Sequence, residues 1–166
     1  MGCGGNAECG CRRKRITISI IRDCAHDAAP DECAFACTRP LSSDWLVFSG
    51  AVYQPVLNHL TGRSLDYGME DYDLAYFDAS DLSYEAEDAV IRRVRAAFDE
   101  PLRSMVEVRN QARVHLWFET KFGEYYAPLS CTAEALERFA SPMFAVGVRL
   151  EPDDRLHIEG FIRAGF

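Results

Sequence analysis

The sequence predicts a mixed α/β protein in which short strands and helices alternate within one domain. Its 166 residues suffice for one domain with a real core and are too few for two comfortable ones. From Trp45 onward, short apolar or alternating segments typical of strands are interspersed with segments whose apolar residues recur at helical spacing. Hydrophobic residues make up 48% of the chain, which fits a folded domain.

Residues 1–40 differ from the rest of the chain. Glycines alternate with cysteines at the start, a basic cluster follows at residues 12–15, and the next stretch has no clear period. We therefore expect an irregular, cysteine- and glycine-rich segment over residues 1–40, with Ile16–Ile21 as its one candidate strand. The folded domain is expected over residues 41–166.

The first strand of this domain is expected at Trp45–Phe48, a short apolar run that Ser49-Gly50 ends. A helix is expected from about Gln54 to Leu60. Pro55 suits the first turn of such a helix, because proline lacks the N–H that would be unsatisfied there. Gly62 follows the end of the helix, where glycine is common.

An acidic strand is expected at Asp71–Phe77. Side chains alternate across a strand, so Asp71 and Asp73 point to the same face. Two carboxylates this close repel each other unless a cation lies between them, and magnesium prefers oxygen ligands. Because aspartate is a poor strand former, this pair suggests that function overrode strand propensity.

A strong helix is expected next, capped by Asp81 or Ser83. Acidic residues load its first turns, which favours the positive end of the helix dipole. Its buried stripe would consist of Val90, Val94 and Phe98.

Another strand is expected at Met105–Arg109, where Val106 and Val108 face one way and Glu107 faces the other. Three elements should follow: a helix from Asn110 through Phe122, a helix over Ala133–Ala140 capped by Thr132, and a last strand over Ala145–Leu150.

Charge and hydropathy limit the partners. The net charge is −8, and residues 41–166 hold twelve basic and twenty-one acidic residues. This acidic balance argues weakly against nucleic acid as a partner, although a local basic pocket remains compatible with it. No run approaches the about eighteen apolar residues of a membrane helix. Ile16–Ile21 is too short for a signal peptide, so we expect a cytoplasmic protein with no membrane association.

Six of the seven cysteines fall within the first 37 residues. Since no export signal is recognisable and the total is odd, we expect reduced thiols. A zinc module is an alternative function, with ligands drawn from Cys9, Cys11, Cys33, Cys37 and His26. The cysteine spacings do not form two Cys-x2-Cys pairs, which disfavours it.

Three features then occur in order along the chain. Ser49-Gly50 ends a strand and leads into a helix, where phosphate can approach free backbone N–H groups. Asp71 and Asp73 follow on a second strand, and Glu107 lies on a third. Three such acids can hold divalent metals, which clamp the attacking and leaving oxygens in phosphoryl transfer.

At these residues the sequence resembles the nucleotidyltransferase superfamily, and more closely a group of bacterial nucleotidyltransferase-like proteins of unassigned substrate. The resemblance covers roughly Trp45 to Leu150, and it is carried by the blocks 49–54, 60–63, 71–78, 81–88 and 106–117. The turn reads Ser-Gly rather than the superfamily's Gly-Ser. Members of the family are expected to continue past Phe166 with a further C-terminal segment.

The resemblance implies a small mixed central sheet flanked by helices. It implies nucleotidyl transfer from a nucleoside triphosphate with release of pyrophosphate, supported by Mg²⁺ or Mn²⁺. Asp71, Asp73 and Glu107 would be the catalytic acids and metal ligands. Ser49 and Gly50 would take the triphosphate.

The sequence leaves open the roles of two arginines and the identity of the acceptor. Arg109 and Arg113 suit phosphate because guanidinium is a planar fork of donors, but a structural ion pair suits each of them equally well. Glu107 itself could form a surface pair with either arginine. The acceptor is expected to be a small molecule or a protein. The alternative function is a non-catalytic member of the same fold that binds a nucleotide or another protein.

Overall fold

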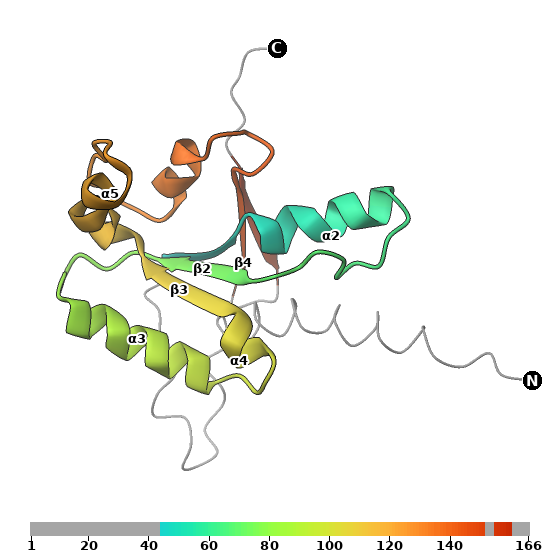
Figure 1. Cartoon of the computed structure of the whole chain (residues 1–166), viewed down its shortest axis with the longest axis horizontal. Helices are drawn as coiled ribbons and strands as arrows, with labels where there is room; N and C mark the ends of the chain where they lie inside the picture. Colours follow the sequence, from blue (N-terminus) through green and yellow to red (C-terminus); the bar gives the residue numbers. More distant parts are fainter. Residues whose placement is uncertain (1–43, 152–154, 161–166) are drawn as a thin grey trace, which may run out of the picture.

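The computed structural model describes residues 44–151 and 155–160, and one five-stranded sheet runs through them (Figure 1). The strands are β1 (Trp45–Phe48), β2 (Tyr72–Tyr76), β3 (Val106–Asn110), β4 (Val146–Leu150) and β5 (Leu156–Gly160). They lie in the order β3-β2-β1-β4-β5. Strands β2 and β3 are parallel, and the other neighbours are antiparallel, so the predicted mixed sheet is confirmed.

Helices flank the sheet on both sides. They are α2 (Gly50–Leu60), α3 (Tyr84–Ala96), α4 (Leu102–Met105) and α5 (Val114–Phe122), with 3-10 helices η1 (Gln111–Arg113) and η2 (Ala133–Arg138). Parallel strands need a long crossover, and α3 supplies it between β2 and β3. In Figure 1, α3 lies on one side of the sheet and α5 on the other.

The alternation of side chains along each strand divides the core into two clusters, one on each face of the sheet. The larger cluster packs strand residues against α2 and α3, and it includes Trp45, Val47, Tyr72, Leu74, Val94, Phe98, Val106 and Val108. The smaller one packs Leu46, Phe48 and Ala75 against Leu129, Ala135 and Leu136. Asp73 and Glu107 share the face of the smaller cluster, which leaves part of β2 and β3 uncovered there.

Several predicted elements are confirmed. Strand β1 is buried along its whole length, and Val106 and Val108 on β3 are buried while Glu107 is exposed. Strand β2 begins one residue after Asp71. Of the two predicted caps of α3, Ser83 is the N-cap, and its hydroxyl accepts a hydrogen bond from the backbone N–H of Ala86 at 3.2 Å.

Helix α2 starts four residues earlier than predicted, at Gly50. The carbonyl of Ser49 accepts hydrogen bonds from the N–H groups of Val52 and Tyr53, so the first turn closes immediately after β1. Pro55 therefore lies inside the helix, and the prediction that it occupies the first turn was wrong.

The helix predicted from Asn110 through Phe122 is interrupted at its start. Asn110 instead ends β3, and η1 precedes α5. The Asn110 side chain accepts a hydrogen bond from the N–H of Ala112 at 3.1 Å, which ties the chain into the tight 3-10 turn. Gly123 ends α5 at a φ of 75°, as a C-terminal glycine should.

The segment predicted as a helix over Ala133–Ala140 is the shorter 3-10 helix η2. Thr132 does not cap it, because the Thr132 hydroxyl donates to the carbonyl of Asp44 at 3.0 Å instead. Strand β5 was not predicted. It lies at the sheet edge, and its apolar residues Leu156 and Ile158 are exposed, which reverses the usual pattern.

Gly147 on β4 packs against two residues of the smaller core cluster, Leu46 and Phe48. It pairs with Phe48 on β1. A β-carbon at this position would lie 3.1 Å from the Cδ1 atoms of both Leu46 and Phe48. Close packing against these two side chains, rather than backbone conformation, therefore favours glycine here.

The structure describes residues 44–151 and 155–160, and some of the sequence predictions concern residues outside these ranges. The candidate strand Ile16–Ile21, the irregular segment 1–40 and its cysteines lie outside them. Within 44–151 and 155–160, no helix is both long and apolar enough to cross a membrane.

Candidate active site

The strand register brings the predicted acids to one end of the sheet. Asp73 on β2 pairs with Glu107 on β3, and these parallel strands point their side chains to the same face. Val47 pairs with Leu74 in the antiparallel β1–β2 ladder, so the end of β1 meets the start of β2. Ser49 and Asp71, the residues that follow and precede these strands, therefore lie at the same end of the sheet.

Asp73 is the electrostatic centre of this group. Its pKa is raised to about 6, first because burial disfavours the charged carboxylate. The neighbouring negative charges of Asp71 and Glu107 raise the pKa further, and the positive charge of Arg109 opposes them. Two carboxylates and one guanidinium therefore act on Asp73, with opposite effects on its pKa.

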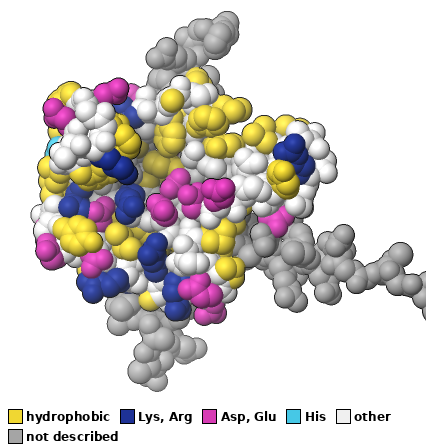
Figure 2. Space-filling model, viewed as in Figure 1, with side chains coloured by type: hydrophobic (Ala, Val, Ile, Leu, Met, Phe, Trp, Pro, Cys, Tyr) yellow, Lys and Arg dark blue, Asp and Glu magenta, His cyan; other side chains and the backbone are white. Residues whose placement is uncertain are grey.

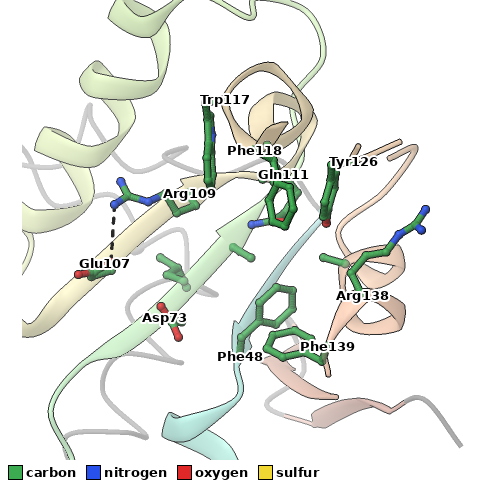
Figure 3. Close-up of a pocket in the computed structure, with 14 residues that line it drawn as sticks. Phe48, Asp73, Glu107, Arg109, Gln111, Trp117, Phe118, Tyr126, Arg138 and Phe139 are labelled. Atoms are coloured by element: carbon green, nitrogen blue, oxygen red, sulfur yellow. Dashed lines mark ion pairs between the residues drawn. The ribbon is translucent and has the colours of Figure 1, made fainter. Parts of the chain in front are cut away.

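Glu107 contacts that guanidinium. A terminal nitrogen of Arg109 lies 3.6 Å from Oε2 of Glu107, and both side chains are about half exposed (Figure 3). The prediction that Glu107 pairs with Arg109 or Arg113 is therefore met by Arg109. Such a pair in solvent is weak, because water screens it and two long side chains must be held in place.

The chemistry of this carboxylate group suits a hard divalent cation, since such ions prefer oxygen ligands and would relieve the concentrated negative charge. In the described part of the chain, however, no three or more histidine, cysteine, aspartate or glutamate side chains are gathered tightly enough to hold a metal ion. The three acids are near enough to repel and are not closed into a cage. The Glu107 carboxylate contacts Arg109 instead, and such a half-exposed pair exchanges partners at little cost.

The junction of β1 and α2 has an unusual backbone. Ser49 has a φ of 50° and a ψ of −116°, and it is the one non-glycine residue with positive φ among residues 44–151 and 155–160. Its side chain makes no capping hydrogen bond. The first N–H groups of a helix have no partner within that helix, so Gly50 and Ala51 present donors beside the acidic strand. Strain of this kind concentrates at functional sites.

The structure does not bring Arg113 to the acids. Its guanidinium forms a buried ion pair with Glu87 on α3, and its Nε donates to the carbonyl of Leu82 at 2.9 Å. Glu87 also accepts a hydrogen bond from the backbone N–H of Asn110 at 2.9 Å. Of the two predicted roles for Arg113, the structural ion pair is the one that this geometry favours.

A cavity of about 280 Å³ opens beside the acids. Its polar lining consists of Asp73, Glu107, Arg109, Gln111 and Arg138, and its apolar lining includes Phe48, Leu74, Ala75, Val114, Trp117, Phe118, Tyr126, Ala135 and Phe139. Figure 2 shows acidic side chains at the rim of a hollow with an apolar floor. Ser49 and Gly50 do not line it.

Aromatic rings make up the far wall of the cavity (Figure 3). Phe118 on α5 lies 4.6 Å from Tyr126, and Phe48 meets Phe139 edge-on at 5.8 Å between ring centroids. The guanidinium of Arg138 lies 5.7 Å from the Tyr126 ring. Sequence analysis did not identify this wall, because its residues come from β1, α5, η2 and two loops that only the fold brings together.

Comparison with known proteins agrees with this architecture. The sequence pattern of the family described as Nucleotidyltransferase matches residues 40–161. A solved structure, determined by NMR and described as revealing a CCA-adding enzyme head domain, shares the fold with a TM-score of 0.62 and 22% sequence identity. That match covers 91% of this chain and 65% of the other. No curated protein matches the sequence.

Proposed function

Because the chain belongs to the nucleotidyltransferase family, we propose that it transfers a nucleotidyl group from a nucleoside triphosphate to a small-molecule or protein acceptor, with release of pyrophosphate. One observation carries the proposal. Asp71 and Glu107 both act electrostatically on Asp73, which pairs with Glu107 across the β2–β3 ladder at the end of the sheet where α2 begins. Phosphoryl transfer requires mainly such positioning and charge neutralisation.

Each residue of the group has a role in this proposal. Asp71, Asp73 and Glu107 would hold Mg²⁺ or Mn²⁺, which when bound neutralises the triphosphate and the departing pyrophosphate. Ser49 and Gly50 would receive the triphosphate through the hydroxyl and the N–H groups at the start of α2. Arg109 would leave its ion pair with Glu107 and contact a phosphate group, because guanidinium binds phosphate oxygens in a planar fork.

A second candidate function is a non-catalytic protein that binds a nucleotide or another protein in the same cleft. The Glu107–Arg109 ion pair favours it, since the Glu107 carboxylate contacts an arginine in this structure and the described residues include no group of three or more metal-ligating side chains. The two functions differ in one measurable outcome: the nucleotidyltransferase releases pyrophosphate, and the non-catalytic binding protein does not.

The test combines thermal unfolding with pyrophosphate release. Wild type is titrated with each of the four nucleoside triphosphates, with and without Mg²⁺ or Mn²⁺, beside Asp73→Ala. A ligand that binds only the folded state raises the free energy of unfolding by about 2.7 kcal/mol when its concentration is a hundred times its Kd. We expect a metal-dependent shift with at least one nucleotide, lost in Asp73→Ala. Pyrophosphate release should fall about a thousandfold, the scale for losing a group that stabilises transition-state charge.

Glu85→Ala is the matched control, because Glu85 is an exposed acid on α3 away from the cleft. It should bind and turn over like wild type. Nucleotide binding without pyrophosphate release would support the non-catalytic function. A protein that unfolds cooperatively and binds no triphosphate with either metal would contradict both functions.

A further inference from the structure

The aromatic end of the cavity contains none of the residues proposed above to hold the metal or the triphosphate. We propose that it is the acceptor site, and that the acceptor is a small planar aromatic molecule with an anionic substituent. This inference rests on the proposed nucleotidyl transfer and adds the chemical class of the acceptor.

The geometry of displacement places the acceptor in the cavity. In an in-line phosphoryl displacement, the attacking and leaving oxygens lie on opposite sides of the phosphorus. The leaving pyrophosphate would lie at the start of α2, which does not line the cavity. Asp73 and Glu107 do line it. The attacking group must therefore reach the acids from a side other than the start of α2, and the cavity lined by Asp73 and Glu107 offers such a side.

The size of the cavity selects a small molecule. Its volume of about 280 Å³ is close to the lower limit of roughly 300 Å³ for small-molecule sites. A small molecule with one flat ring system is compatible with this volume, whereas a folded protein segment is not. The proposal therefore narrows the acceptor from small molecule or protein to small molecule.

The lining selects an aromatic ring with a negative charge. Aromatic walls hold flat ring systems by stacking, and they do so with little dependence on which ring is bound. Trp117, Phe118 and Tyr126 are three of the aromatic residues that line the cavity. Arg138 lines the cavity beside Tyr126, and its exposed side chain extends outward past that ring in this structure (Figure 3). The proposal requires this guanidinium to turn toward the cavity, where it would meet an anionic group. Carboxylates at one end and a guanidinium at the other would orient such a molecule.

The probes are the four nucleoside 5′-monophosphates, which join a flat ring to an anionic group, with ribose 5-phosphate as the matched ligand that lacks the ring. Binding to the full chain is measured by titration calorimetry. We expect at least one monophosphate to bind wild type and ribose 5-phosphate not to bind. Trp117→Ala should weaken binding at least tenfold. Leu116→Ala, which changes the exposed neighbour on the same helix, should change it less than twofold.

Arg138→Gln is the second variant, because it alters an exposed side chain and does not depend on the packing of α5. It should weaken monophosphate binding about tenfold. Equal binding by wild type and both variants would overturn the proposal. So would the absence of monophosphate binding in a protein that still binds a triphosphate with its metal, and this result would leave the proposed function standing.

A competition experiment separates the acceptor from the base of the donor nucleotide. The titration is repeated at saturation with Mg²⁺ and a non-hydrolysable analogue of the triphosphate that binds best. Unchanged monophosphate binding would support an acceptor site. Loss of binding would assign the cavity to the donor base and overturn the proposal. Failure of every triphosphate to bind would overturn the proposed function and the acceptor site together.

Discussion

Two acid–arginine pairs at β3 use the same chemistry in opposite ways: one lies on the strand, and the other joins α3 to the residues just past the strand's end. Near the start of β3, Glu107 and Arg109 are 3.6 Å apart and about half exposed. Just past its end, Glu87 and Arg113 are only 8% and 11% exposed. The second pair is also surrounded by backbone partners, since Asn110 donates to Glu87 and Arg113 donates to Leu82.

The difference shows that surroundings, and not residue type, decide the role of a charged pair. A buried pair whose remaining donors and acceptors are satisfied cannot exchange partners without a large cost. An exposed pair exchanges partners at little cost. The buried pair therefore fixes the fold behind the site, and the exposed pair is free to serve a ligand.

The largest effect is expected at the buried pair. Glu87→Ala leaves the Arg113 guanidinium buried without its carboxylate, and it removes the acceptor of the Asn110 N–H. Removing one partner of a buried ion pair costs about 3–5 kcal/mol. Urea unfolding should show that loss in the free energy of unfolding.

Arg92→Ala is the control on the same helix, because Arg92 pairs with Asp88 at 2.8 Å and is 74% exposed. It should cost less than about 1 kcal/mol. Equal losses in the two variants would remove the distinction between buried and exposed pairs.

A smaller effect of opposite sign is expected at Asp73. Its pKa of about 6 in the folded protein lies above the ordinary value of 3.8, so folding favours the protonated acid. Stability should therefore fall as the pH rises from about 4 to about 6. Asp73→Asn removes this cost. The full shift corresponds to about 3 kcal/mol, and partial exposure to solvent reduces the expected gain at pH 7 to about 1–2 kcal/mol.

Unfolding of wild type and Asp73→Asn at pH 4 and pH 7 measures this difference. The variant should be more stable at pH 7 and nearly equal to wild type at pH 4. A gain that is the same at both pH values would show that ionisation of Asp73 is not its cause. Magnesium should also bind wild type more weakly below pH 6, because a ligand carboxylate must be deprotonated.

The smallest effect is expected at the exposed pair. Arg109→Gln should change the free energy of unfolding by less than about 1 kcal/mol, since a half-exposed ion pair contributes little. It should also raise the pKa of Asp73, because the positive charge of Arg109 lowers that pKa. NMR titration of the Asp73 carboxyl group checks this direction. A destabilisation comparable to that of Glu87→Ala would contradict the comparison.

Local pattern predicted most of the fold. The buried run at β1, the alternation along β3 and the Ser83 cap are signals that neighbouring residues carry, and each was read correctly. Strand β5 escaped prediction because its apolar residues face solvent at a sheet edge. The starts of α2 and α5 were misplaced because the carbonyl of Ser49 and the side chain of Asn110 decide them.

The candidate site was predictable only in part. Asp71, Asp73 and Glu107 could be proposed from alternation and from family resemblance, and strand pairing then placed two of them side by side. The partner of Arg113 could not be chosen, because Glu87 lies 26 residues away in sequence. The cavity could not be predicted either, because Phe118, Tyr126 and Phe139 lie in separate segments of the sequence and follow no common spacing.

Gly147 has a consequence for how this protein can diversify. It stands behind Phe48, and Phe48 forms part of the cavity wall. A methyl group at position 147 would crowd the side chains of Leu46 and Phe48, and no acid of the site is among its three nearest neighbours. The shape of the ligand space and the chemistry beside it are therefore encoded at separate positions, so selection can change one while the other is preserved.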